Sequence, residues 1–313
     1  MLILAPMQGL TELMFRKVYY RCFPGALDYA ISPFLSLTHG NLAEAWKKID
    51  DVLPEPNKDS IPVVPQILGK EPVEFIELAN RLHEIGYTEV NWNIGCPMRR
   101  VTAKHRGSGI LPYPAEVDHL LSRVVPNLKP KLSIKMRLGL VSPNEIFNLI
   151  PVLNNYPLHN ITIHPRTGRQ QYTGQVDLDT LDRVIPLLHH TIIYNGDICT
   201  PADYQRIRQR FPTIHDCMIG RGILYDPLLP LKIKDEPNNG LTSTLHFVQL
   251  LLDAIQTMPI REESRMRKTK EYWCLIRKSI PITEQQAMTV LHAQSPQETY
   301  QRILSLLQSI KKN

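Results

Sequence analysis

The chain has 313 residues, of which 43% are hydrophobic, so it is long enough for one large core and a smaller appended domain. Its formal net charge of +6 is compatible with a polyanionic partner but does not require one. The five cysteines form no C-x-x-C pair or metal-type spacing, and the opening run MLILAPMQGL is far shorter than the roughly 20 apolar residues of a membrane span, so we expect a cytoplasmic protein without disulfides, bound metal, export signal or membrane anchor.

Short runs rich in Ile, Val and Leu alternate with longer segments of helical period through most of the chain, which predicts repeated strand–helix units around a parallel sheet. The predicted strands end near Ala5, Ser32, Gln66, Asn93, Arg137, His164, Asn195 and Gly220. Eight such units favour an α/β fold of the closed (β/α)8 type, the TIM barrel. A doubly wound sheet has fewer strands and a glycine-rich first turn, which APMQGL is not.

We expect the barrel to occupy residues 1–238. The following DEPNNGLTST combines Pro, Asn, Gly and a Thr/Ser cluster, which is typical of a linker leading into a helix. From Leu245 onward, apolar residues recur at helical spacing in LHFVQLLLDAI, EYWCLIRKSI and YQRILSLLQSI. Residues 242–313 therefore predict a small all-helical domain.

Polar residues occur at the strand ends, where the active site of a barrel lies. In KLSIKMRLG, alternation places Lys135 and Arg137 on one face and Ile134 and Met136 on the other. The same alternation puts further polar side chains toward the barrel mouth, namely Gln66, Asn91, Asn93, Thr162 and His164. Each unpaired buried polar group costs about 1 to 3 kcal/mol, so a polar ligand is expected to supply their partners.

Two later turns indicate that part of this ligand is a phosphate. NGDICTP follows the seventh strand, with Thr200 and Pro201 as the N-cap and first residue of a helix, and GRGI follows the eighth. Glycines let backbone N–H groups approach an anion, and barrels commonly bind phosphate after strands seven and eight. A G-x-G pattern by itself is a common turn, so the prediction of a phosphate site rests on its position after the eighth strand.

Cys96 ends the fourth strand between Gly95 and Pro97. A cysteine whose location in the fold is unknown is often a small, buried hydrophobic residue. At a barrel mouth, a thiol can also serve as nucleophile or general acid. No paired base for a nucleophile is legible in the sequence, and His105 lies in a loop of unassigned conformation. All three roles stay open on the residues alone.

The motifs APMQG, NIGCP, KMRLG, HPRT with YTG, NGDI and IGRG, in this order from about Leu2 to Leu224, resemble the tRNA-dihydrouridine synthases. The resemblance implies FMN-dependent reduction of a uridine in tRNA, with NADPH reducing the flavin. It implies that Cys96 is the general acid, protonating carbon 5 of uracil. The implied cofactor-binding residues are Pro6, Met7, Gln8, Gln66, Lys135, His164, Asn195, Gly196, Asp197, Gly220 and Arg221. The implied substrate contacts are Asn93, Arg99, Arg100, Arg137 and Arg166.

The tail carries cations interleaved with Tyr272 and Trp273, a mixture suited to phosphate and base contact, although a charge run is often only a solvated face. The tail residues predicted to bind tRNA are Arg267, Lys268, Lys270 and Arg277.

Two other functions are compatible with the sequence. One is an FMN-dependent barrel reductase of a small molecule, such as a dihydropyrimidine precursor or an enone, which would not need the basic tail. The other is an RNA-binding relative without catalysis, because the loop TAKHRGSGILPYP after Cys96 has larger residues than the resemblance leads us to expect. We further expect a monomer, although no sequence feature determines the oligomeric state.

Overall fold

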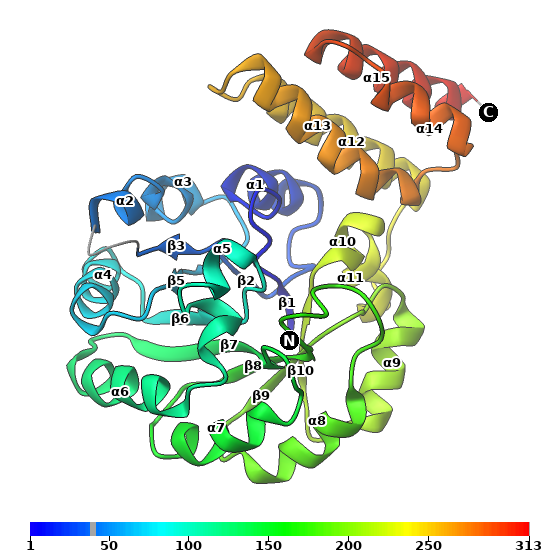
Figure 1. Ribbon diagram of the computed structural model, residues 1–313. Helices are drawn as coiled ribbons and strands as arrows, with labels where there is room; N and C mark the ends of the chain where they lie inside the picture. Colours follow the sequence, from blue (N-terminus) through cyan, green and yellow to red (C-terminus); the bar gives the residue numbers. More distant parts are fainter. Residues whose placement is uncertain (38–41, 313) are drawn as a thin grey trace.

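The computed structural model describes residues 1–37 and 42–312, and its strands and helices form a barrel with a helical extension (Figure 1). The strands are β1 (Leu2–Leu4), β2 (Tyr29–Ile31), β3 (Leu35–Ser36), β4 (Val63–Val64), β5 (Gln66–Leu68), β6 (Glu89–Ile94), β7 (Lys131–Gly139), β8 (Ile161–Thr167), β9 (Ile192–Asn195) and β10 (Asp216–Ile219). All of their pairings are parallel, in the order β3-β5-β6-β7-β8-β9-β10-β1-β2-β4.

The barrel closes at Pro65, which separates β4 from β5 within one extended segment. On one side of this segment Ala30 donates to the Pro62 carbonyl at 2.7 Å, and on the other Asn91 donates to the Pro65 carbonyl at 2.8 Å. β4 thus pairs with β2 and β5 with β6. Because proline lacks an N–H donor, it interrupts the ladder without opening the ring. The predicted (β/α)8 barrel is confirmed, with β3 as an additional short strand beside β5.

Helices surround the strands. Those of the barrel are α1 (Leu13–Cys22), α2 (Leu42–Trp46), α3 (Pro54–Asn57), α4 (Pro72–Glu84), α5 (Arg99–Thr102), α6 (Pro114–Val124), α7 (Glu145–Asn154), α8 (Leu178–Val184), α9 (Pro201–Arg210), α10 (Arg221–Tyr225) and α11 (Leu229–Lys234). One of them, α5, lies over the carboxyl ends of the strands (Figure 1). Thr200 and Pro201 begin α9 as predicted, and the Thr200 and Asp203 side chains form a capping box there. This cap fixes the end of the loop that follows β9.

Alternation along the strands divides the core into two parts. In and just after β1, Leu2 and Leu4 belong to the large core between strands and helices, whereas Ile3 and Ala5 pack inside the barrel with Met218. The inner cluster is small, so the rest of the barrel interior is left to polar side chains at the carboxyl ends of the strands.

Four helices follow the barrel: α12 (Leu241–Gln256), α13 (Glu262–Ile276), α14 (Glu284–Leu291) and α15 (Pro296–Lys312). α12 lies beside α1 and α13 beside α10, and α14 and α15 pack on the side away from the barrel (Figure 1). Phe15 of α1 packs edge-on against Phe247 of α12 and stacks on Tyr272 of α13, with ring centroids 5.9 and 6.1 Å away. Division of the chain into two independently folding domains stays a prediction. In the described parts of the chain, no helix combines the length and apolar character needed to cross a membrane.

Candidate active site

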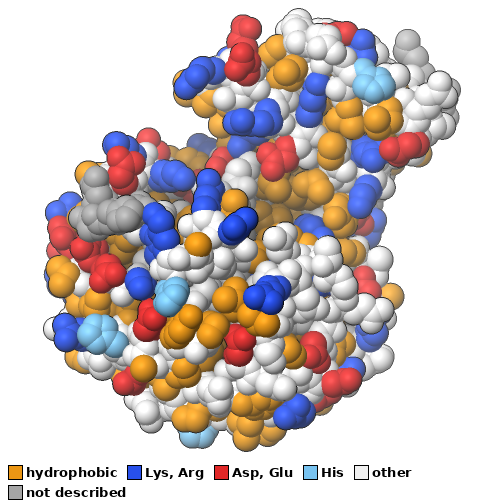
Figure 2. All heavy atoms as spheres, in the orientation of Figure 1, with side chains coloured by type: hydrophobic (Ala, Val, Ile, Leu, Met, Phe, Trp, Pro, Cys, Tyr) orange, Lys and Arg blue, Asp and Glu red, His pale blue; other side chains and the backbone are white. Residues whose placement is uncertain are grey.

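A cavity of about 760 Å³ opens at the carboxyl ends of the strands, a size in the usual range for ligand sites. Most of the predicted site residues meet in its wall. These are Pro6, Met7, Gln8, Asn93, Cys96, Arg99, Arg100, Lys135, Arg137, His164, Asn195, Gly196, Asp197, Gly220 and Arg221. On the surface, Lys and Arg side chains gather on this face between α5 and the C-terminal helices (Figure 2). Strand order alone therefore brings together residues that lie far apart in the sequence.

Cys96 is held by the side chain of Asn93, which precedes it on β6. Asn93 Oδ1 accepts the backbone N–H of Gly95 at 3.0 Å and that of Cys96 at 2.9 Å. Two hydrogen bonds to one oxygen fix the turn that presents the thiol, whose residue is 9% exposed.

Gln66 does not line the cavity but lies behind Asn93, fully buried. Its Oε1 accepts from Asn93 Nδ2 at 2.7 Å, and its Nε2 donates to Asn91 Oδ1 at 2.7 Å. Asn91 in turn donates to Ser133 Oγ at 2.9 Å. The amide of Gln66 is thus satisfied by other strands of the barrel, and it supports the Cys96 turn through Asn93.

A glycine-rich segment that the sequence argument left without a role holds the other side of Cys96. The backbone N–H and the hydroxyl of Ser108 both donate to the Cys96 carbonyl, at 3.0 and 3.1 Å. Gly107 has φ +55°, and a Cβ there would lie 2.6 Å from the same carbonyl oxygen. Gly107, the first glycine of RGSG, is the sequence signal for this close approach, because a side chain would not fit there.

Burial determines the protonation state of the thiol. It raises the pKa of Cys96, although the Met98 backbone N–H and the nearby cations act in the opposite direction. The thiol therefore stays protonated at neutral pH, which suits a proton donor better than a nucleophile, since the thiolate is the nucleophilic form.

Lys135, Arg137 and His164 are basic side chains in the wall of the cavity, which Pro6, Met7 and Leu10 also line. Burial, reinforced by Arg137, lowers the pKa of Lys135 to about 7. Burial also lowers the pKa of Arg137, to about 10, and it lowers the pKa of His164 well below its usual value, with help from the neighbouring cations. An anionic ligand beside Lys135 and Arg137 would favour their charged forms and raise both pKa values again.

Arg166 does not line the cavity and is buried behind it. Its Nη1 lies 3.2 Å from His164 Nε2 and donates to Asp197 Oδ1 at 2.9 Å. Since His164 is neutral, its Nε2 accepts this bond and its Nδ1 carries the hydrogen. Asp197 Oδ1 also accepts from Arg221 Nη2 at 3.0 Å. The Arg166–Asp197 pair thus orients both the imidazole and Arg221.

Tyr172 is a cavity residue to which the sequence argument gave no role, although it belongs to the quoted YTG motif. It is 54% exposed, and the guanidinium carbons of Arg137 and Arg221 lie 5.4 and 5.0 Å from its ring centroid. An exposed ring between two cations offers a flat surface at the cavity entrance.

Arg267 in the tail is exposed, whereas the other three predicted tRNA contacts are engaged within the chain. Lys268 bonds to Gly9 and Glu12, Lys270 bonds to the carbonyls of Leu291 and Ala293, and Arg277 pairs with Glu284.

The interpretation of Tyr272 and Trp273 as base-stacking groups is wrong. Both side chains are buried, and Trp273 Nε1 donates to the Ala287 carbonyl at 3.0 Å. They face the helical core, because helical spacing placed them on its apolar side.

The cavity fits FMN, the cofactor implied by the sequence resemblance. Ala5, Pro6 and Met7 supply an apolar wall, and Gln8 Oε1 is buried without a hydrogen-bond partner among the described residues, so a ligand donor would satisfy it. A Cβ built on Gly220 would approach Ala5 and Met7 at 3.5 and 3.6 Å, filling space at this wall. The cations described above match the negative charge of the phosphate.

Comparison with known proteins gives consistent similarities. The family model for dihydrouridine synthase matches residues 3–312. A tRNA-dihydrouridine(16) synthase of Pseudomonas putida is 30% identical over 236 residues, covering 74% of this chain and 72% of that protein. A tRNA-dihydrouridine synthase B of Pasteurella multocida is 29% identical over 231 residues, covering 73% and 67%. Among solved structures, the old yellow enzyme from Trypanosoma cruzi aligns at TM-score 0.52 and 12% identity, covering 76% and 89%, a likeness of fold alone.

Proposed function

The chain belongs to the dihydrouridine synthase family, and from this premise we propose that it reduces a uridine of tRNA to 5,6-dihydrouridine using bound FMN, NADPH and a proton from Cys96. It is an oxidoreductase that acts on tRNA. The single observation that carries the finer proposal is the placement of a protonated, buried thiol in the wall of a cation-lined cavity of cofactor size.

The residues that would hold FMN form two groups. Pro6, Met7 and Gln8 line one part of the cavity, and the basic side chains Lys135 and His164 line another. The phosphate and ribitol part of FMN would be held at the ends of β9 and β10 and in the loops that follow, that is by Asn195, Gly196, Asp197, Gly220 and Arg221. When bound and reduced by NADPH, FMN supplies a hydride for carbon 6 of uracil.

Cys96 holds the proton for carbon 5 at its Sγ. Asn93 and Ser108 fix the backbone of this residue from two sides and thereby the position from which the thiol reaches the cavity. The raised pKa keeps the proton in place until it is transferred, since the ionised form is disfavoured by burial. Positioned proton transfer of this kind typically contributes about 10² to 10⁴-fold to a rate.

The substrate base must leave its stack to enter the cavity, because the site lies below the rim of the barrel. Arg99 and Arg100 follow the Cys96 turn on α5 and line the same cavity, where a phosphate backbone would pass. Tyr172 at the entrance provides a ring on which an extruded base or its neighbour can stack.

The test is incubation of the purified FMN-loaded protein with NADPH and tRNA that lacks dihydrouridine, followed by mapping of the product along the tRNA. We expect dihydrouridine at a defined position. A protein that carries FMN and oxidises NADPH but forms no dihydrouridine in tRNA would contradict the proposal.

A further inference from the structure

The β1–α1 loop, residues Pro6–Glu12, lies between the cavity and the C-terminal helix α13. Pro6, Met7, Gln8 and Leu10 line the cavity, and Leu275 of α13 lines it too. One short loop therefore has the proposed cofactor site on one side and a helix from the far end of the chain on the other.

Helix α13 bonds directly to the backbone of this loop. Lys268 Nζ donates to the Gly9 carbonyl at 2.7 Å and to Glu12 Oε2 at 2.8 Å, and the Lys268 side chain is only 12% exposed. The Tyr272 hydroxyl donates to the Leu10 carbonyl from a fully buried ring. Two consecutive loop carbonyls are thus satisfied by α13 rather than by the barrel.

Within the loop, the Met7 carbonyl accepts the backbone N–H groups of Leu10 and Thr11, both at 3.0 Å, which forms a turn. Thr11 closes it, because its Oγ1 accepts from Met7 N at 2.8 Å and donates to the Ala5 carbonyl at 3.0 Å. Gly9 at the tip has φ +83°, a conformation that only glycine adopts readily. These bonds leave the carbonyls of Gly9 and Leu10 to partners outside the turn, and Lys268 and Tyr272 of α13 supply them, which ties the tip of the loop to α13.

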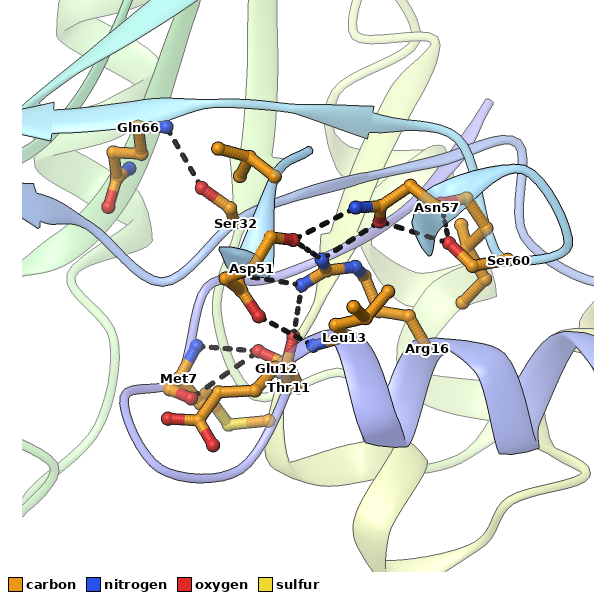
Figure 3. Close-up of polar contacts among 12 residues, drawn as sticks. Met7, Thr11, Glu12, Leu13, Arg16, Ser32, Asp51, Asn57, Ser60 and Gln66 are labelled. Atoms are coloured by element: carbon orange, nitrogen blue, oxygen red, sulfur yellow. Dashed lines mark hydrogen bonds and ion pairs between the residues drawn. The ribbon is translucent and has the colours of Figure 1, made fainter. Parts of the chain in front are cut away.

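The base of the loop is anchored separately, by Arg16 of α1 (Figure 3). This guanidinium is fully buried and donates to the Thr11 carbonyl at 2.9 Å, to Asp51 Oδ2 at 3.1 Å and to Asn57 Oδ1 at 3.1 Å. The Arg16 cluster fixes where the loop ends, whereas the tip that carries Gln8 and Leu10 faces α13.

We propose that Lys268 and Tyr272 are positioning residues that hold the tip of the β1–α1 loop against FMN, so that cofactor binding and docking of the C-terminal helices are coupled. This inference rests on the proposed function for the identity of the cofactor. The coupling is reciprocal: a docked α13 strengthens FMN binding, and bound FMN stabilises the docked helix to the same degree.

The experiment compares FMN affinity in the full-length protein, stripped of flavin and titrated with FMN by fluorescence quenching. The test variants are Lys268→Met and Tyr272→Phe, alone and combined. Matched controls are Lys270→Met and Tyr300→Phe, which remove a lysine bonded to the Leu291 and Ala293 carbonyls and a hydroxyl bonded to Asp253 at 2.5 Å, both away from the loop. Thermal unfolding of the flavin-free proteins reports general damage to the tail.

We expect the combined test variant to bind FMN on the order of tenfold more weakly, since charge-assisted bonds are the strong ones, while both controls keep wild-type affinity. Lys268→Arg should retain most of the FMN affinity that Lys268→Met loses, because arginine keeps hydrogen-bond donors and the positive charge. Hydrogen exchange should show that FMN slows exchange of α13 amides in the wild-type protein but less in the combined variant.

Equal FMN affinity in the wild-type protein and the folded combined variant would overturn the coupling and leave the proposed function intact. An equal loss in the controls would overturn it too, because the effect would then be general weakening of the tail. Failure of the wild-type protein to bind FMN would overturn the cofactor assignment and the coupling with it.

Discussion

At the residue scale, the protonation of Lys135 couples to the charge of whatever occupies the cavity. Burial and Arg137 lower its pKa to about 7, so above that pH the empty site holds a mostly neutral amine. An anionic cofactor beside the amine favours the charged form and raises the pKa again. Binding must then take up a proton.

We therefore predict that FMN binding at pH 8 is accompanied by uptake of nearly one proton and that the uptake disappears near pH 6, where Lys135 is already charged. Calorimetry in buffers of different ionisation enthalpy measures this number. Lys135→Arg, which cannot deprotonate, is the control and should bind without uptake. A binding enthalpy for FMN that is the same in all buffers at pH 8 would mean that the protonation of Lys135 does not change when the ligand binds.

At the element scale, the turn that carries Cys96 is held between Asn93 of β6 and the Gly107–Ser108 segment. The close approach at Gly107 leaves no room for a side chain, since a Cβ would lie 2.6 Å from the Cys96 carbonyl and 2.9 Å from its Cβ. Both contacts involve the residue that holds the proton, so any accommodation moves the thiol.

Gly107→Ala should lower the rate of tRNA reduction by about 10²-fold or more while costing about 1 to 3 kcal/mol of stability, from backbone strain and steric conflict. Gly25→Ala is the matched control, because Gly25 also has positive φ but no atom lies within 4 Å of its added Cβ. It should lose a smaller amount of stability, from strain alone, and keep its activity. Full activity in folded Gly107→Ala would show that the packing of this segment does not position Cys96.

At the scale of the whole molecule, we expect tRNA affinity to depend on the arginines of α5, Arg99 and Arg100, which line the cavity. Replacing both Arg99 and Arg100 with alanine should weaken tRNA affinity and reduce the slope of log affinity against log salt by about 1.5, as for two lost phosphate contacts. Arg123→Ala, an exposed cation in the last turn of α6, should leave both quantities unchanged. An unaltered salt slope in the double variant would place the phosphate contacts elsewhere.

Much of this arrangement follows from the sequence, because strand period and strand order are local and repetitive. The alternation in KLSIKMRLG sufficed to put Lys135 and Arg137 in the cavity and Ile134 and Met136 in the outer core. Alternation gives the face of a strand but not the depth of a side chain, so it could not separate Gln66, behind the wall, from residues in it.

The tail shows the second limit. Helical spacing and charge described α13 as a basic surface, yet Lys268 bonds to a carbonyl 259 residues away, and the two aromatic rings beside it belong to the core. Which cations are consumed by internal carbonyls depends on how distant elements pack, and no local pattern encodes it. The position of Tyr172 between two arginines could not be predicted for the same reason, since the three residues come from the ends of three different strands.

The most direct test of the central claim, proton donation by Cys96, is the rate at which unmodified tRNA reoxidises the pre-reduced, flavin-loaded protein in the absence of oxygen. We predict that Cys96→Ala binds FMN and is reduced by NADPH like the wild-type protein, while its tRNA-driven reoxidation slows by about 10² to 10⁴-fold. Reoxidation of Cys96→Ala at the wild-type rate, with dihydrouridine formed, would contradict the role assigned to this thiol.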